Sequence, residues 1–285
     1  MPTIVLMGAP GSGKSKMACE TAVKRPVHVL DIDRKLKGMA WVWPYLKSGD
    51  VTSWELAQPL IRGKLGNRVR LLAKNENPDL EPLGWKTLCE YVDNIERKEE
   101  FKNCGTLVID SATTMGDHLA RAILFLDDKG TSTLSPRNWA SYQAAWKEVV
   151  TCFRDLCIRE DKDLIVTVHE RVSEIPGDST SKVIRRKDPI SGITEREFIG
   201  TMDVKIATAI NGQFGIEMPL HFEEVYHLFV EMDKDKNPVW RCRVLPDGRR
   251  DLRTSFPVTK AVFSPNFKEI WGIRHENQQK QSSSV

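Results

Sequence analysis

The sequence lacks several features that would assign it to a membrane or to the outside of a cell. It has no apolar run near the roughly eighteen residues of a membrane-spanning helix, and it begins with a strand-like run instead of a signal peptide. Its six cysteines include no C-x-x-C pair, and no histidine stands at zinc-ligand spacing. Cys152 and Cys157 fall in a helical stretch, where we expect core thiols. We therefore predict a protein of the reducing cytoplasm, with no membrane partner.

An excess of charge of one sign is also missing. The chain has 42 Lys and Arg against 39 Asp and Glu, so its formal net charge is +3 over 285 residues. That balance does not indicate a nucleic-acid partner by itself. Basic residues do gather in "IRGKLGNRVRLLAK" (61–74) and "SKVIRRK" (181–187). Either run can be an ordinary solvated surface, so charge alone leaves nucleic-acid contact open.

Strand-like and helix-like segments alternate over the first 170 residues. Apolar, β-branched runs predict strands at 2–8, 27–33, 106–111 and 163–170. Segments with helical spacing lie between them, at 14–24, 34–49, 83–102, 112–127 and 137–160. This order predicts an α/β fold with a mostly parallel sheet and crossover helices.

The chain changes character after residue 170. Residues 171–197 are polar, charged and interrupted by Pro and Gly, which predicts a long functional or disordered loop. "EVYHLFVEMD" and "PVWRCRVLP" flank "KDKN" and predict a β-hairpin, which "SPNFKEIWGI" follows as a last helix. With no repeat and no clear linker, we expect one domain over 1–275, with a core at 1–210 and a β extension and helix at 211–275. Residues 276–285 are expected to be a disordered tail.

The stretch "GAPGSGKS" matches the phosphate-binding pattern G-x-x-x-x-G-K-[ST] between a predicted strand and a predicted helix. Its glycines let the backbone turn so that successive N–H groups point inward at phosphate oxygens. Lys14 is expected to contact the β and γ phosphates, and the Ser15 hydroxyl to bind Mg²⁺. The predicted nucleotide-binding residues are Gly8, Ala9, Pro10, Gly11, Ser12, Gly13, Lys14 and Ser15.

A magnesium nucleotide site also requires an acid, because Mg²⁺ is held by few protein oxygens and keeps most of its waters. Asp110 ends the apolar run "TLVID", where the chain should emerge beside the phosphates, and is the predicted second ligand. The alternative is that Asp110 caps the following helix, and both roles are compatible.

Hydrolysis needs a further group that orients or deprotonates the attacking water. Asp110 is followed by Ser111, whereas many ATPases have Glu there, so the catalytic acid must come from another strand end. Asp33, beyond Asp31 in "VLDID", and Glu170 in "VTVHE" are the candidates, and a third interpretation is that neither serves. His169 ends the same strand as Glu170, either as a γ-phosphate sensor that moves the following segment or as a structural group.

"GAPGSGKS", "VLDID", "TLVIDS" and "LIVTVHER" have the order and approximate spacing of the RecA-like ATPases, which the chain resembles over most of residues 3–275. "INGQFGIEMPLHFEEVYHLFVEM" and "VWRCRVLPDGRRDLRTS" resemble, more narrowly, phage nucleotide-binding proteins that act as RecA-like single-strand annealing ATPases. The resemblance implies a RecA-like P-loop NTPase core that binds ATP and Mg²⁺. It implies that Asp33 stands where the family's water-activating acid lies, a position that is commonly Glu.

The resemblance also implies a single-stranded DNA partner, bound through loops at about 128–137 and 171–200. The basic residues of the second loop are Arg171, Lys182, Arg185, Arg186, Lys187 and Arg196. It further implies a ring or filament of identical subunits, in which a cation reaches the ATP of the neighbour. Arg253 best fits that position, with Arg249 and Arg250 as alternatives, and a charged hairpin edge is the other interpretation.

These inferences predict a Mg²⁺-dependent, DNA-stimulated ATPase that anneals single strands during phage-type recombination, in the cytoplasm of a bacterial host. Three alternatives stay open: a helicase or helicase loader, a nucleotide-switched binding protein that scarcely hydrolyses ATP, and a small-molecule kinase. The sequence does not decide whether a single-strand-binding protein is a partner.

Overall fold

The computed structural model describes residues 2–56, 83–126, 134–176, 182–187, 194–199, 202–210, 214–255, 258 and 260–270. Its strands are β1 (Thr3–Gly8), β2 (Val27–Asp31), β3 (Val51–Glu55), β4 (Thr106–Asp110), β5 (Asp163–Pro176), β6 (Lys182–Lys187), β7 (Thr194–Ile199), β8 (Met202–Thr208), β9 (Glu224–Met232), β10 (Pro238–Arg243) and β11 (Val262–Phe263). Its α-helices are α1 (Lys14–Glu20), α2 (Trp43–Ser48), α4 (Leu83–Val92), α5 (Glu99–Asn103), α6 (Ala112–Leu126), α7 (Pro136–Arg159) and α8 (Phe214–Glu217). Short 3₁₀ turns are η1 (Leu36–Gly38), η2 (Ala40–Val42), η3 (Ile95–Arg97) and η4 (Met218–His221).

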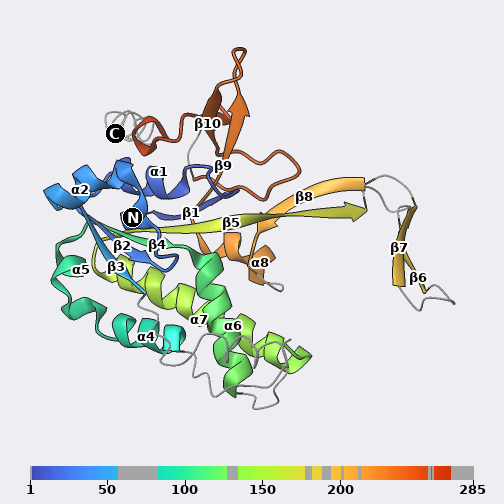
Figure 1. The fold of residues 1–285 in the computed structure, drawn as a ribbon, viewed down its shortest axis with the longest axis horizontal. Helices are drawn as coiled ribbons and strands as arrows, with labels where there is room; N and C mark the ends of the chain where they lie inside the picture. Colours follow the sequence, from blue (N-terminus) through green and yellow to red (C-terminus); the bar gives the residue numbers. More distant parts are fainter. Residues whose placement is uncertain are drawn as a thin grey trace, which may run out of the picture.

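A nine-stranded sheet forms the centre of the molecule (Figure 1). Its order is β11-β10-β9-β1-β5-β4-β2-β3, and β8 pairs with β5. The strands from β9 to β3 in this order are mutually parallel, whereas β10, β11 and β8 pair antiparallel. The predicted α/β class is confirmed, with a mostly parallel sheet, crossover helices and a β9–β10 hairpin.

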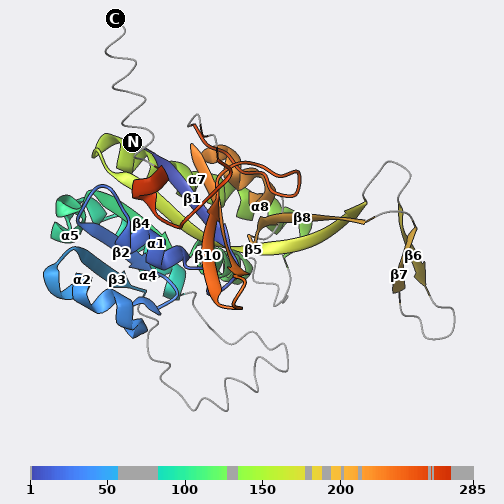
Figure 2. The ribbon, with the colours of Figure 1, turned by 90° about the horizontal axis from the view of Figure 1, so that it is seen from above.

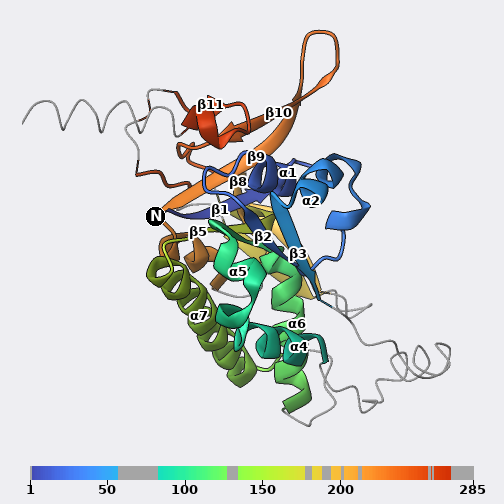
Figure 3. The same ribbon diagram turned by 90° about the vertical axis from the view of Figure 1, so that its left-hand side faces the viewer.

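Strand alternation divides the core between the two faces of the sheet, because successive side chains point to opposite faces. Val5 and Met7 of β1 pack in the cluster that includes α4, α6 and α7. Ile4 and Leu6 pack in the other cluster, which includes α1. Figure 3 shows these helices on opposite sides of the sheet. Since helices cover both faces, the central parallel strands are mostly apolar, and the carboxyl ends of the parallel strands meet at one edge.

Two predicted helices are interrupted. The segment predicted as a helix at 34–49 is η1, η2 and α2, because the Asp31 carboxylate accepts the backbone N–H groups of Lys35 and Leu36 and holds a tight turn there. The segment at 83–102 is α4, η3 and α5. The Asn94 side chain donates to the carbonyl of Glu90, which the next turn of helix would otherwise use. Strand β3 was not predicted.

The prediction of a long loop directly after residue 170 is wrong. Strand β5 continues to Pro176 and pairs with β8 from Glu170 opposite Thr208 to Pro176 opposite Met202. Strands β6 and β7 form a second antiparallel pair, with Arg185 opposite Arg196. Figures 1 and 2 show the β5–β8 ribbon extending beyond the sheet, with β6 and β7 at its far end. An antiparallel pair of strands tolerates polar residues where a face is open to solvent, and Arg171 and Val172 are exposed.

Several predictions concern residues outside those that the structure describes. These are the basic run at 61–74, most of the loop at 128–137 and the tail at 276–285. Residues 267–270 are helical, within the predicted last helix. The cysteine thiols are free; Cys157 is buried as expected, but Cys152 is exposed on α7. Among the described residues, no helix is long and apolar enough to cross a membrane.

Candidate nucleotide-binding site

The turn after β1 has a backbone that requires glycine. Gly11 and Gly13 have φ angles of +79° and +89°, in the left-handed region that side chains disfavour. A Cβ atom on Gly8 would lie 2.2 Å from the backbone oxygen of Leu228 on the neighbouring strand β9. Helix α1 begins at Lys14, so its free N–H groups lie directly after this turn. The predicted glycine-rich turn between a strand and a helix is therefore present.

Lys14 is held at the mouth of this turn. Its Nζ donates to the backbone oxygens of Gly8 and Ala9, each at 2.8 Å, and the side chain is buried. Burial lowers the pKa of Lys14 to about 8, although the nearby carboxylates of Asp110, Glu170 and Asp33 act to raise it. The ammonium group therefore lies in a partly desolvated place, where an added anion would bind strongly.

Asp110 lies at the end of β4, beside the start of α1. Its Oδ1 accepts a hydrogen bond of 2.5 Å from the Thr167 hydroxyl of β5, and the Ser15 hydroxyl also donates to it. Burial raises the pKa of Asp110, and these two hydrogen bonds lower it. The structure thus brings Ser15 and Asp110 together. A hydroxyl and a carboxylate are hard oxygen ligands that fit Mg²⁺, which takes its remaining ligands from water and phosphate.

The alternative role considered for Asp110 was to cap helix α6. The neighbouring residue Ser111 caps that helix instead. Ser111 Oγ accepts the backbone N–H of Thr114 at 3.4 Å in the first turn of that helix. Among the described residues, no group of three or more His, Cys, Asp or Glu side chains is arranged to hold a metal ion.

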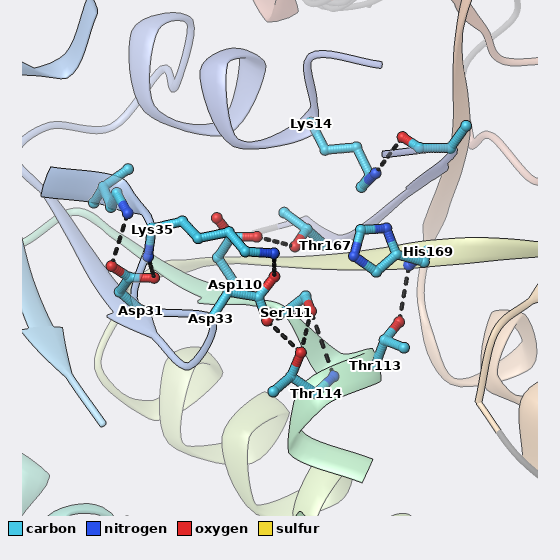
Figure 4. Close-up of polar contacts among 12 residues, drawn as sticks. Lys14, Asp31, Asp33, Lys35, Asp110, Ser111, Thr113, Thr114, Thr167 and His169 are labelled. Atoms are coloured by element: carbon cyan, nitrogen blue, oxygen red, sulfur yellow. Dashed lines mark hydrogen bonds and ion pairs between the residues drawn. The ribbon is translucent and has the colours of Figure 1, made fainter. Parts of the chain in front are cut away.

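Asp31 and Asp33 have different surroundings, although strand alternation predicts that they share a side. The strand ends at Asp31, whose carboxylate binds the backbone of η1. Asp33 instead accepts hydrogen bonds from Ser111 Oγ, at 3.0 Å, and from the Thr114 hydroxyl (Figure 4). Lys35 Nζ lies 3.6 Å from its Oδ2. Asp33 therefore lies over the start of α6, beside Asp110.

His169 and Glu170 stand at the point where β5 leaves the sheet. The His169 backbone N–H donates to Thr113 Oγ1 at 2.9 Å. Its side-chain Nδ1 is buried and has no hydrogen-bond partner among the described residues. Burial and then the charge of Lys14 lower the pKa of His169, so the ring is neutral at pH 7. His169 is therefore close enough to Lys14 for its titration to respond to the charge of that lysine.

Glu170 points toward β9 and binds His227, with 2.6 Å between Oε2 and Nε2. This hydrogen bond is the main cause of the lowered pKa of Glu170, and the charges of Arg250 and Lys14 lower it further. Glu170 is therefore ionised at pH 7 and already engaged by a neighbouring side chain.

Three arginines were predicted to reach the ATP of a neighbouring subunit. Among the described residues, none of them forms a hydrogen bond with the phosphate-binding turn of its own chain. Arg250 forms an ion pair with Asp247 of its own chain. Arg253 is exposed, and its backbone pairs with Val225. Arg249 is exposed as well. An exposed cation away from its own site is compatible with a role in a second subunit.

The residues predicted to bind DNA lie on the ribbon. Arg171 is on β5 and is exposed, Lys182, Arg185, Arg186 and Lys187 are on β6, and Arg196 is on β7. Apart from Arg171, their side chains lie outside what the structure describes.

Four side chains that the sequence did not indicate also belong to this region. Thr113 and Thr114 follow the strand-end acid, and a pair of hydroxyls at that position was an available signal. Thr167 and His227 are single polar residues within apolar strands, a pattern that also indicates ordinary buried polar groups. A tryptophan of the β9–β10 hairpin contacts the turn as well, and no local pattern predicts it.

The chain matches one known family. A family model described as an AAA domain covers residues 1–228. No curated protein matches the sequence. The matched range contains all the strand ends just described and His227, but it stops before β10.

Proposed function

The chain belongs to this AAA-domain family, and on that basis we propose that it is a Mg²⁺-dependent ATPase that binds single-stranded DNA and promotes annealing, in the manner of phage recombination proteins. The proposal includes assembly into a ring or filament of identical subunits. The observation that carries it is the meeting of Lys14, Ser15 and Asp110 at the carboxyl edge of the sheet.

The nucleotide part of the proposal follows from the chemistry of these three groups. Lys14 and the N–H groups at the start of α1 would bind the phosphates, and Ser15 with Asp110 would hold Mg²⁺. Bound Mg²⁺ supplies positive charge to the phosphate oxygens that become more negative during transfer. Lys14, in its desolvated position, adds a second positive charge that is already oriented.

Asp33 is our candidate for the acid that orients the attacking water. Ser111 and the Thr114 hydroxyl fix one carboxylate oxygen, which leaves the second beside Lys35. Glu170 is the less favoured acid, because its carboxylate points toward β9 and His227, whereas Asp33 lies beside Asp110, the proposed Mg²⁺ ligand.

The DNA part of the proposal is supported by the continuity of β5. The strand passes from His169, near Lys14, through the exposed Arg171 and into the ribbon that ends beside β6 and β7. A γ phosphate that contacts His169 would therefore contact the residue directly before this ribbon, whose pairing with β8 begins at Glu170. Basic residues along the ribbon suit contact with the phosphate backbone of a single strand.

The test is ATP turnover with and without single-stranded DNA. Lys14→Ala should lower turnover at least about 100-fold, a typical loss for a preorganised charge. Lys16→Ala is the matched control and should leave turnover unchanged, because Lys16 is an exposed lysine on the same helix that pairs with Glu20. Wild-type turnover that DNA does not stimulate would overturn the DNA part, and turnover that survives in Lys14→Ala would overturn the ATPase part.

One observation favours a second function. The presumed water-activating acid is the shorter Asp33, and two hydroxyls engage it. A nucleotide-switched binding protein with very slow hydrolysis would have such a site. Asp33→Glu should then raise turnover while DNA binding continues to depend on ATP. Unchanged turnover in Asp33→Glu would remove this alternative, and strand displacement on a forked duplex would indicate a helicase in place of an annealing protein.

A further inference from the structure

Trp240 of β10 contacts the phosphate-binding turn from the side of the β9–β10 hairpin. Its indole Nε1 donates to the backbone oxygen of Gly11 at 3.2 Å. A Cβ atom on Gly13 would lie 3.2 Å from its Cδ1. The edge of the five-membered ring therefore rests against the turn. The residue is nevertheless 44% exposed, so part of its ring surface is open to solvent.

The surroundings of Trp240 are apolar and open. Across the hairpin it stands opposite Val230, and the next pair outward on the same face is Pro238 opposite Met232. Val230 and Met232 are both exposed. The next pair inward, Cys242 opposite Leu228, is fully buried in the core cluster that includes α1. The core thus continues outward as an apolar strip, which contacts the phosphate-binding turn at Trp240.

We propose that Trp240 is the platform on which the base of the bound nucleotide stacks. This inference rests on the proposed function and deepens it by naming the substrate class. The phosphates would be fixed by Lys14 and the turn, and the nearest exposed aromatic surface in the described chain is the ring that already touches Gly11. Stacking on an indole face requires no particular base, because every base has a π-face.

The apolar strip also predicts how selective the platform is. Val230, Pro238 and Met232 carry no strong hydrogen-bond donor or acceptor that could read the edge of a base. Recognition by stacking alone depends on ring area. The site should therefore prefer purine over pyrimidine nucleoside triphosphates and should distinguish poorly between adenine and guanine.

The test measures equilibrium dissociation constants of ATP, GTP, CTP, UTP and inorganic tripolyphosphate. Trp240→Ala should weaken ATP and GTP binding by about tenfold to a hundredfold, the range expected for the loss of one stacked base. Binding of tripolyphosphate should stay within about twofold, and Trp240→Phe should keep part of the purine affinity. The matched control is Trp43→Ala, because Trp43 is 56% exposed and its Nε1 also donates to a backbone oxygen, that of Lys37.

Fluorescence gives a second readout that does not depend on the stability of the alanine variant. ATP should quench the emission of Trp240, so the change should disappear in Trp240→Phe and persist in Trp43→Phe. Equal losses for ATP and tripolyphosphate in Trp240→Ala would mean that the ring only supports the turn. Unchanged binding together with an altered oligomeric state would make the strip a protein interface. Either result would overturn the proposed role of Trp240 in stacking the base. Neither result would affect the Lys14-dependent turnover that tests the proposed function.

Discussion

Glu170 of β5 and His227 of β9 are joined across the end of β1, with 2.6 Å between Oε2 and Nε2. Strand β1 lies between these two strands in the sheet, and Gly8, where the phosphate-binding turn begins, pairs with His169. The His227 side chain is 2% exposed and that of Glu170 18% exposed. This partly buried pair therefore joins the two strands on either side of the turn.

Removing this pair should destabilise the fold. Glu170→Ala leaves the buried imidazole of His227 without its partner, and we expect the free energy of unfolding to fall by about 1–3 kcal/mol. Glu231→Ala is the matched control, because its pair with Arg241 has the same 2.6 Å separation but is exposed and should contribute at most about 1 kcal/mol. Urea unfolding of the two variants checks this prediction. Equal losses of unfolding free energy in the two variants would mean that the Glu170–His227 pair stabilises the fold no more than an exposed ion pair does.

Nucleotide affinity should fall as the pH rises above 8. Lys14 has a pKa lowered to about 8 in the folded chain, so half of its charge is lost at that pH. The dissociation constant for ATP should rise by up to about tenfold per pH unit above 8, because binding requires the ammonium form. Lys14→Arg stays charged and should give a flat profile between pH 7 and 9.5.

The lowered pKa of Lys14 also affects how the stability of the nucleotide-free protein depends on pH. Between pH 8 and the ordinary value of 10.5, the unfolded chain binds more protons at Lys14 than the folded chain does. The contribution of Lys14 to stability therefore rises with pH over that window. A wild-type stability that falls there no less steeply than that of Lys14→Arg would contradict the assigned pKa.

Asp33 and Glu170 can be separated as water-orienting acids. If Asp33 serves, Asp33→Asn should lower turnover by about 10²–10⁴-fold with little change in ATP affinity, because only the attack on the phosphate is affected. Glu170→Gln should retain most of the turnover, since an amide oxygen still accepts from His227. Single-turnover kinetics of both variants measure the chemical step, and the reverse pattern would assign the role to Glu170.

The proposed cation from a neighbouring subunit can be tested by mixing two inactive variants. Arg253→Ala should lose turnover if Arg253 reaches the ATP of the next subunit, and Lys14→Ala loses its own site. A mixture should regain part of the activity, because the intact turn of one variant meets the intact arginine of the other. Arg250→Ala is the control, since Arg250 pairs with Asp247 within its own chain. A mixture that stays inactive would exclude Arg253 from this role.

Local sequence was sufficient for the parts of the site that depend on one strand and its following turn. The turn from Gly8 to Ser15 needs glycines at fixed positions, and an apolar run that ends in a polar residue marks each strand end, as at Asp110 and His169. These features depend on neighbours in the chain, so pattern reading finds them. It failed at residues 171–176, because charge and a proline concealed the continuation of the strand.

The sequence by itself determined that a strand, a glycine-rich turn and a helix follow one another, and that acids follow the neighbouring strands. Only the tertiary structure decided which neighbour each of those acids contacts. Asp31 turned to the backbone of η1, Asp33 to Ser111 and Glu170 to His227. It also brought Trp240 to Gly11, 229 residues away along the chain. The physical reason is that the order of strands in the sheet follows from burying two apolar faces at once, and no local pattern encodes that order.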